Sequence, residues 1–278
     1  MNRTHKRLIS HPCKNNTIKL MKRVIIVILV GLIACGPAFG WGREGHETIA
    51  KIAENHLKPS AKKKIEKYLG GYSIVHFAKW MDDYRHTPEY KFTTTWHTAP
   101  VDASLRYDEA LLDPKKGNAI YGLEGAIKAL ENYKELPDSA VAVNIKYILH
   151  LVGDMHCPAH IKYTTHNMKY YAFMPGDKKS TYVHTIWDKL AIQETRIYSA
   201  TEWALILDIV DRKTAKEIAA GTPREWLHDS AVRCEMQFDI LKPDQKVDQD
   251  FFNVAMPLIE TQILYAGHRL AAVLNSIF

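Results

Sequence analysis

Residues 147–160 read YILHLVGDMHCPAH, which places three histidines and an aspartate in one apolar stretch. On a helix, His150 and Asp154 stand four positions apart, so they share one face with Cβ atoms about 6 Å apart. His160 follows Pro158, where the helix is expected to end. Burying so many ionisable groups costs free energy unless a positive charge compensates them, and Zn²⁺ binds both imidazole and carboxylate groups. The stretch predicts a metal-binding helix end, against the alternative of a buried helix whose polar groups are satisfied by hydrogen bonds.

Helical periodicity dominates the chain on both sides of this stretch, because apolar residues recur with a spacing near 3.6. There is no internal repeat, low-complexity tract, Gly-rich phosphate loop or nucleophile elbow. The sequence predicts one all-α domain, mainly helical, with short extended pieces such as residues 91–100 and a loop or hairpin at 161–182. The expected helices are 48–57, 61–69, 74–85, 119–133, 139–153, 194–210, 214–220, 223–241 and 249–277.

Residues 1–40 are typical of a secretory signal peptide. They hold seven Lys or Arg and no acidic residue, followed by an apolar run at 24–35 and a small-x-small site at 38–40. The run is shorter than the roughly 20 residues of a membrane span. Cleavage between Gly40 and Trp41 is expected, which leaves a domain of residues 41–278 in the periplasm or outside the cell, with no membrane segment. Residues 1–20 precede a second candidate start at Met21, and a lipoprotein-type cleavage before Cys35 is the alternative.

The charge balance changes once this segment is set aside. The full chain holds 37 basic and 31 acidic residues, a formal charge of +6, whereas residues 41–278 carry a charge of −1. Strong non-specific attraction for nucleic acid needs an excess of positive charge. Any attraction for a polyanion must therefore come from bound metal or from a local patch.

Further candidate ligands lie outside the opening stretch. His184 and Asp188 repeat the spacing of four, and His97 lies in the short extended piece. A terminal amine at Trp41 could chelate a metal together with its own carbonyl, and His46 is near enough in sequence to join them. These pairs have the ligand types of a multinuclear site. Two cysteines, Cys157 and Cys234, remain after cleavage, and the sequence leaves open whether they form a disulfide.

Several motifs in this order resemble the S1/P1-type zinc nucleases, a family of single-strand nucleases and 3′-nucleotidases. The motifs are WGREGHETIAKIAENHL from residue 41, WMDDYR from 80, WH at 96–97, LHLVGDMHCPAH from 149, HTIWD from 184 and AGHRLAAVLNSIF from 266. They extend over nearly all of residues 41–278. The resemblance also favours Trp41 as the mature N-terminus, because the mature Trp of that family binds zinc through its main-chain amine and carbonyl.

The resemblance implies a cleft with three Zn²⁺ ions. Asp82 is preferred to Asp83 because the family ligand stands two residues after the Trp, here Trp80. Asp154 would bridge two ions about 3.5 Å apart and position a hydroxide, with Asp82 as the second residue assigned to catalysis. The implied ligand sets are Asp82, His97, His150 and Asp154 for one ion, Trp41, His46 and Asp154 for a second, and His160, His184 and Asp188 for the third.

The implied activity is a zinc-dependent phosphodiesterase that hydrolyses single-stranded DNA and RNA to 5′-phosphate products. Metal-activated hydroxide would attack phosphorus in line, while the third ion would stabilise the leaving 3′-oxygen. Duplexes should be poor substrates because a base must leave the stack. A 3′-nucleotidase activity stays open, and no obligate protein partner is expected. The alternatives are a three-zinc phospholipase C and a non-catalytic zinc-binding protein of the same fold.

The sequence departs from the family pattern in places that bear on base recognition. Thr98-Ala99-Pro100 stands where members often carry an aromatic residue and a base-binding Asp, and Cys157-Pro158-Ala159 replaces the usual Gln-Pro-Leu. The Gly-Gly-Asn loop before the last His is not recognisable in residues 175–182. No base preference is therefore predicted. His156 lies outside the implied ligand set and is expected to be structural, whereas Arg85 either orients Asp82 or forms a surface salt bridge.

Overall fold

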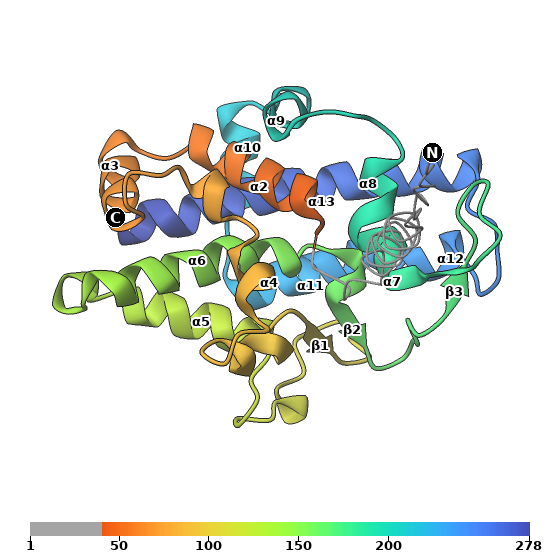
Figure 1. The fold of residues 1–278 in the computed structure, drawn as a ribbon, viewed down its shortest axis with the longest axis horizontal. Coiled ribbons are helices and arrows are strands. Elements are labelled where there is room, and N and C mark those ends of the chain that lie inside the picture. The colour runs from red at the N-terminus through yellow and green to blue at the C-terminus, as the bar shows by residue number, and fades with distance from the viewer. Residues whose placement is uncertain (1–40) are drawn as a thin grey trace, which may run out of the picture. The chain divides into compact units, whose positions relative to one another are not determined.

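Helix α13 (Gln249–Ile277) runs along the length of the structure, and the other long helices pack around it (Figure 1). The computed structural model describes residues 41–278, so the expected signal peptide and its cleavage site after Gly40 lie outside the described residues. The Asp248 side chain accepts a hydrogen bond from the Phe251 amide and starts α13, as a capping residue does. The buried side chains of α13 recur every three or four residues as far as residue 263, whereas residues 266–271 are all buried, so the helix enters the core over its second half.

Two helices next to α13 carry the polar centre described below. Helix α2 packs closely on α13, and α6 lies beside both, with α5 on its outer side (Figure 1). The C-terminal half of α6 is buried on all sides, so its apolar residues cannot be assigned to one face. The main helices are α2 (Arg43–Asn55), α3 (Pro59–Tyr68), α4 (Trp80–Tyr84), α5 (Ala119–Leu130), α6 (Asp138–Asp154), α9 (Ala200–Leu207), α10 (Arg212–Ala219), α11 (Pro223–Cys234) and α12 (Gln237–Ile240).

The all-α prediction is confirmed, but three predicted helices are interrupted. The segment predicted as one helix at 74–85 is a 3-10 turn, η1 (Ile74–Phe77), followed by α4 after a break at Ala78 and Lys79. The helix predicted at 194–210 is shorter, since Ser199 and Glu202 form a capping box that starts α9 there. The segment predicted at 223–241 divides into α11 and α12. Around the expected His184 and Asp188 pair, the chain forms α7 (Val183–Thr185), the π-helix η6 (Ile186–Leu190) and α8 (Ala191–Gln193).

The extended pieces form two small sheets. The first pairs β1 (Ala99–Val101) in parallel with β2 (Ile161–Tyr163), with Ala99 opposite Ile161. The second is an antiparallel pair of β3 (Tyr171–Ala172) and β4 (Thr181–Tyr182), so the expected loop or hairpin at 161–182 contains a hairpin. Short 3-10 turns η2 (Lys91–Thr95), η3 (Glu109–Leu111), η4 (Tyr133–Glu135) and η5 (Pro158–His160) complete the described elements.

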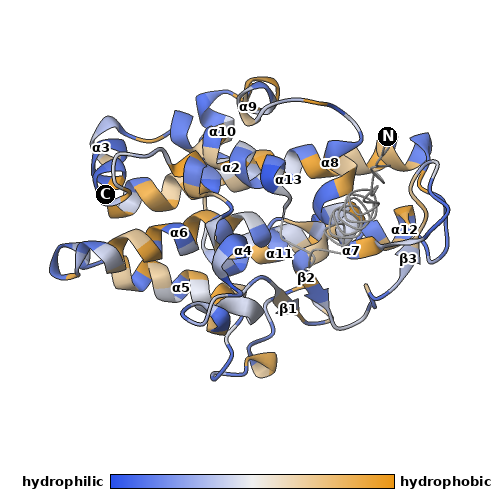
Figure 2. Cartoon of the chain, in the orientation of Figure 1, coloured by the Kyte–Doolittle hydropathy of each residue, from blue (hydrophilic) through white to orange (hydrophobic). Residues whose placement is uncertain are grey.

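The core is continuous from one end of the helical body to the other. Trp41, Ile52 and Ile148 are fully buried within one hydrophobic cluster that draws on nearly every long helix. Apolar residues are concentrated on α6 and α13 in Figure 2, whereas α3 at the edge is mostly hydrophilic. The core holds the helices that carry the polar residues in a fixed arrangement, since close-packed interiors tolerate little displacement.

The contact between α2 and α13 gives a test of this packing. A Cβ added at Gly267 would lie 2.5 Å from Ile52 Cγ2, whereas a Cβ at Gly125 on α5 would meet no atom within 4 Å. We expect Gly267→Ala to lower the free energy of unfolding by about 1–3 kcal/mol through overpacking. The matched Gly125→Ala should leave it unchanged or raise it by up to about 1 kcal/mol, because alanine favours helix. Urea denaturation of zinc-saturated protein measures both, and equal effects would contradict the close approach.

Candidate metal centre

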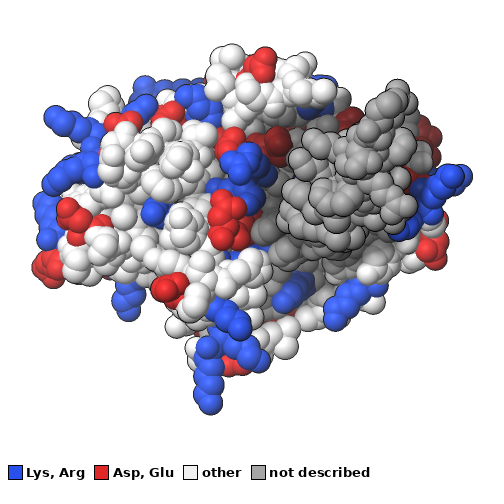
Figure 3. Space-filling model, viewed as in Figure 1, with Lys and Arg blue, Asp and Glu red and all other residues white. Residues whose placement is uncertain are grey.

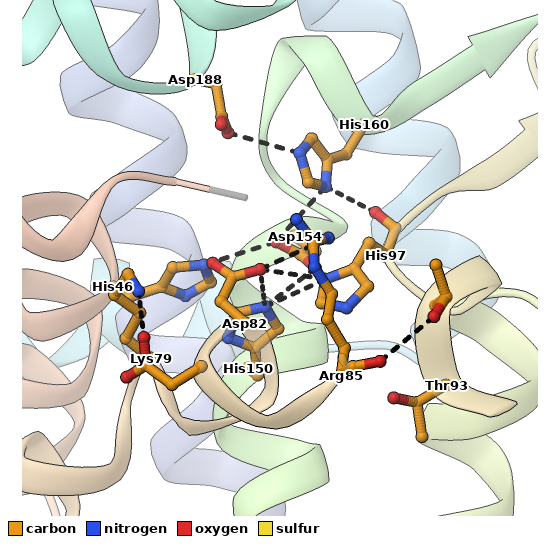
Figure 4. A network of polar contacts seen from close by, with 12 residues as sticks. His46, Lys79, Asp82, Arg85, Thr93, His97, His150, Asp154, His160 and Asp188 are labelled. Atoms are coloured by element: carbon orange, nitrogen blue, oxygen red, sulfur yellow. Dashed lines mark hydrogen bonds and ion pairs between the residues drawn. The ribbon is translucent and has the colours of Figure 1, made fainter. Parts of the chain in front are cut away.

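Asp154 lies at the centre of a buried cluster of histidines and carboxylates (Figure 4). Its two carboxylate oxygens face different partners. Oδ2 lies 2.9 Å from His97 Nδ1 and 3.3 Å from His150 Nε2, and Oδ1 lies 3.4 Å from His46 Nε2 and 3.3 Å from His160 Nδ1. One carboxylate at the end of α6 therefore joins side chains from four separate segments of the chain.

Asp82 closes one side of the cluster. Its Oδ1 lies 3.6 Å from His97 Nδ1 and 3.7 Å from His150 Nε2, and its side chain is fully buried. The adjacent Asp83 is exposed and pairs with Lys79 on the surface. Arg85 is buried, with Nη1 3.5 Å from Asp82 Oδ1, so it is an internal partner of this carboxylate and not a surface salt bridge.

The break before α4 orients His150. At the break, the Ala78 carbonyl accepts a hydrogen bond from His150 Nδ1 at 3.0 Å. Within a continuous helix that carbonyl would be committed to the amide four residues later. Because Nδ1 donates to the Ala78 carbonyl, Nε2 of His150 faces Asp82 and Asp154. Metal-binding histidines are commonly oriented by such a hydrogen bond from the other ring nitrogen. The sequence analysis missed this interruption because the apolar spacing continues across it.

The parallel pairing of β1 and β2 sets His97 beside His160. His97 stands two residues before β1 and His160 directly before β2, and the His97 carbonyl accepts a hydrogen bond from His160 Nδ1. This contact turns His160 Nε2 toward Asp188 Oδ1, 3.3 Å away. A strand pairing between segments about 60 residues apart is not visible in local periodicity.

The π-helix η6 carries Asp188, and His184 lies just before it. Asp188 and His184 approach His160 in different ways, since Asp188 Oδ1 contacts Nε2 while the His184 ring stacks on the imidazole at 4.9 Å. The Gly42 amide donates to the Asp188 main-chain carbonyl at 2.7 Å, which ties the start of α2 to this turn. π-helical turns are frequent at functional sites.

The two cysteines of residues 41–278 are free thiols and both are buried. Cys157 Sγ lies 3.5 Å from Asp188 Oδ1, and Cys157, His160 and Asp188 form one of the groups whose ligand atoms all lie within 4.8 Å of one another. Cys157 also stands between candidate ligands in the sequence, which is the signal that it faces the cluster.

His156 is held outside the cluster, as expected for a structural residue. Its Nδ1 donates to the Val152 carbonyl at 2.7 Å, so Nε2 accepts from Arg269 Nη1 at 2.8 Å. Arg269 also donates to Asp229 Oδ2 at 2.7 Å. Burial, followed by the charge of Arg269, holds the pKa of His156 well below its ordinary value, so the imidazole is neutral. This network fastens the end of α6 to α11 and α13, and the sequence analysis missed Arg269 because it lies in an apolar stretch.

Many buried polar atoms of the cluster lack hydrogen-bond partners within residues 41–278. They include both nitrogens of His46, both oxygens of Asp82, His97 Nε2, Asp154 Oδ1 and His160 Nε2. An unsatisfied buried polar group costs about 1–3 kcal/mol, and charged groups cost more. Groups of imidazole and carboxylate atoms within 4.8 Å of one another match the ligand types and crowding of a zinc site. The cluster therefore fits metal ions, which would satisfy these atoms together. The main-chain amine of Trp41 is a ligand only if the chain is cleaved after Gly40.

Burial is the largest single influence on ionisation in the cluster, although neighbouring charges outweigh it at Asp154. Burial raises the pKa of Asp82 to about 6, and it lowers the pKa of His46 to about 3 and of His97 to about 4, which leaves both imidazoles neutral and able to bind metal. Burial also opposes ionisation of Asp154, but the charges of His150 and His160 and their hydrogen bonds outweigh it. The pKa of Asp154 consequently lies well below its ordinary value, and the central carboxylate stays ionised.

A cleft of about 660 Å³ opens beside the cluster. His97, His160 and His184 line its inner side, so the candidate ligands border the open space. Volumes of about 300–1,000 Å³ are usual for small-molecule sites. The remaining wall mixes cationic, aromatic and apolar side chains, among them Arg85, Lys162, Tyr163, Met168, Lys169 and Tyr182.

Comparison with known proteins gives one consistent result. The family model described as S1/P1 Nuclease matches residues 41–278. Nuclease S1 of Aspergillus oryzae is 26% identical, in an alignment that covers 92% of this chain and 98% of the relative. Endonuclease 2 of Arabidopsis thaliana is 24% identical over 92% of this chain and 97% of its own. Nuclease P1 of Penicillium citrinum is 25% identical over 85% and 97%.

Zinc should stabilise the fold through this cluster. At a zinc concentration about 1,000 times the Kd, binding contributes about 4 kcal/mol, or a rise in Tm of about 8–16 °C for a chain of this size. We expect Asp82→Asn to lose much of the rise because it removes a buried ligand charge. The adjacent Asp83→Asn should keep it, since Asp83 is exposed. Calorimetry with zinc and with chelator measures the shifts, and an equal rise in both variants would exclude Asp82 as a ligand.

Proposed function

This chain belongs to the S1/P1 nuclease family and is a phosphodiester hydrolase, and we propose that it cleaves single-stranded DNA and RNA with three zinc ions held around Asp154. The observation that carries the proposal is that the two Asp154 oxygens face different histidines. Oδ2 faces His97 and His150, and Oδ1 faces His46 and His160. A carboxylate with partners on both oxygens is suited to bridge two ions.

The proposed ligand sets are those implied by the motifs. When bound, the ions supply Lewis-acid activation of water and of the phosphoryl group. The unsatisfied atoms of His46, Asp82, Asp154 and His160 support the assignment. The proposed ligands are Asp82, His97, His150 and Asp154 for one ion, the main chain of Trp41 with His46 and Asp154 for the second, and His160, His184 and Asp188 for the third.

Hydrogen bonds from main-chain carbonyls and an ion pair with Arg85 fix the orientation of these ligands. The Ala78 carbonyl holds the proton of His150 on Nδ1, and the His97 carbonyl does the same for His160. Each imidazole therefore directs Nε2 toward its carboxylate partner, where a bound metal ion would replace the Nε2 proton. Arg85 pairs with Asp82 and also lines the cleft, where a guanidinium can contact a phosphoryl oxygen.

The cleft supports a single-stranded substrate. Lys162 and Lys169 line it and can neutralise backbone phosphates, and Tyr182, whose ring stacks on His184 at 5.8 Å, offers an aromatic surface near a candidate ligand. Stacking on such a surface requires a base that has left its duplex. Basic and acidic side chains are interspersed on the face seen in Figure 3, with Lys and Arg gathered mainly over α3. The local cations of the cleft, together with metal, would then provide the attraction for substrate.

We further propose a periplasmic or secreted location, which rests on the signal peptide expected at residues 1–40. None of the helices described between residues 41 and 278 is both long and apolar enough to cross a membrane. A 3′-nucleotidase activity fits the same cleft, because a 3′-phosphorylated nucleotide presents a similar phosphoryl group. The relatives named above carry nuclease names, which gives no support to a phospholipase C or to a non-catalytic protein.

The proposed role of Trp41 leads to an experiment on the N-terminus. Protein that begins at Trp41 should bind three zinc ions and cut single-stranded DNA. A form with one extra residue ahead of Trp41 should bind about one zinc fewer and lose most activity, because its main-chain nitrogen is an amide and no longer an amine. Metal analysis and a cleavage assay on both forms provide the test. Equal zinc content and activity would exclude the terminal amine as a ligand.

Substrate choice separates the proposed function from its alternatives. We expect duplex DNA to be cut at least about tenfold more slowly than the single strand, since extruding a base costs a few kcal/mol and 1.4 kcal/mol corresponds to tenfold. The comparison uses the two forms of one sequence at one salt concentration, alongside vesicles of phosphatidylcholine. Release of the lipid headgroup without DNA cleavage would favour a phospholipase C. Inactivity on both substrates with zinc bound would favour a non-catalytic protein.

A further inference from the structure

A second group of metal-binding side chains lies outside the proposed ligand sets. It consists of His56, Asp208 and His268, whose ligand atoms all lie within 4.8 Å of one another. His56 follows α2, Asp208 follows α9, and His268 lies within α13. We propose that these three side chains bind a fourth zinc ion, independent of the Asp154 cluster, which clamps α2, α9 and α13 together.

The geometry brings the three groups to one point. Asp208 Oδ2 lies 2.8 Å from His56 Nε2, and Asp208 Oδ1 lies 3.2 Å from His268 Nε2. The two imidazole rings are 4.5 Å apart, tilted by 49°. One carboxylate thus faces the Nε2 atoms of two histidines, and the three helices concerned are in mutual contact. Two imidazoles and one carboxylate form a usual protein ligand set for zinc, with the remaining position open to water.

A buried ring nitrogen of His268 gives independent support for a bound ion at this point. Its side chain is 3% exposed, yet its Nε2 has no hydrogen-bond partner among the described residues, because the approach of Asp208 lacks hydrogen-bond geometry. Burial, followed by the nearby His56, lowers the pKa of His268, although Asp208 raises it in part. The ring is therefore neutral at neutral pH and has a lone pair that can bind metal. A metal ion would satisfy Nε2 and share the carboxylate between both rings.

The site is accessible to metal from solvent. The His56 side chain is 39% exposed and Asp208 is 11% exposed, so an ion can enter without opening the core. A simple network, in which Asp208 Oδ2 accepts from His56 and Oδ1 faces His268 Nε2 at 3.2 Å, would account for the His56 contact but would leave the contact to His268 poorly aligned. A zinc clamp accounts for all three side chains. It would fasten the end of α9, whose neighbouring Ile209 is 80% exposed and adds little packing.

Equilibrium dialysis against zinc buffers tests the proposal on the full domain, residues 41–278. We compare the unsubstituted protein with His56→Gln, His268→Gln and the control His76→Gln, which alters an exposed histidine stacked on Tyr72. His56→Gln and His268→Gln should each bind one zinc per chain fewer than the unsubstituted protein, and His76→Gln should bind the same number. Single-stranded DNA cleavage should stay within about twofold in all four proteins, because the Asp154 cluster is untouched.

Zinc counts that are equal in all four proteins across the buffer range would overturn the proposal, whatever their activity. If His268→Gln does not fold, His56→Gln decides, since His56 is partly exposed. Anomalous diffraction at the zinc edge gives a direct second measurement, with a peak expected between His56, Asp208 and His268. An empty position there, in crystals whose Asp154 cluster holds zinc, would equally refute it. Failure of the nuclease proposal would change activity and not this zinc count, so the two outcomes are distinguishable.

Discussion

The desolvation of one carboxylate is the constraint on which the rest of this structure depends. Asp154 is fully buried at the end of α6, where an isolated negative charge would be very costly. Its ionised form persists because imidazole nitrogens from several segments surround both oxygens. Each of those histidines is itself buried and must be held by something else. The surrounding segments of the fold position these histidines.

Most of this positioning is done by short segments outside the long helices. The break before α4 directs a carbonyl at His150, the β1 and β2 pair brings a carbonyl to His160, and a π-helical turn carries Asp188. The break and the π-helical turn each replace regular α-helical hydrogen bonding at one place, whereas the β1 and β2 pair forms its own parallel hydrogen bonds. The long helices α2, α6 and α13 provide the close packing that keeps such irregular segments fixed. The long helices therefore provide rigidity, and the short segments place the candidate ligands.

This division also explains what could be predicted from sequence. Helix α13 was expected at 249–277 and forms over that range, and α6 was expected at 139–153 and spans Asp138–Asp154. The pairing of His150 with Asp154 followed from a spacing of four on one helix. The contacts of Ala78 and Arg269 could not be predicted, since each joins segments that are distant in sequence. The motifs supplied the candidate ligands and Arg85 as a candidate partner of Asp82, but not the carbonyls that orient His150 and His160.

The electrostatics of substrate binding follow from the same arrangement. Residues 41–278 carry a net charge of −1, so the surface alone cannot concentrate a polyanion. With metal bound, the cluster would contribute the negative charges of Asp82, Asp154 and Asp188 beside neutral imidazoles. Three divalent ions, as proposed, would reverse the local sign to positive next to Lys162 and Lys169, which line the cleft. The metal would then both satisfy the buried ligands and attract phosphate. Positive charge would be confined to the cleft, where a flexible single strand can bend to meet it and a stiff duplex cannot.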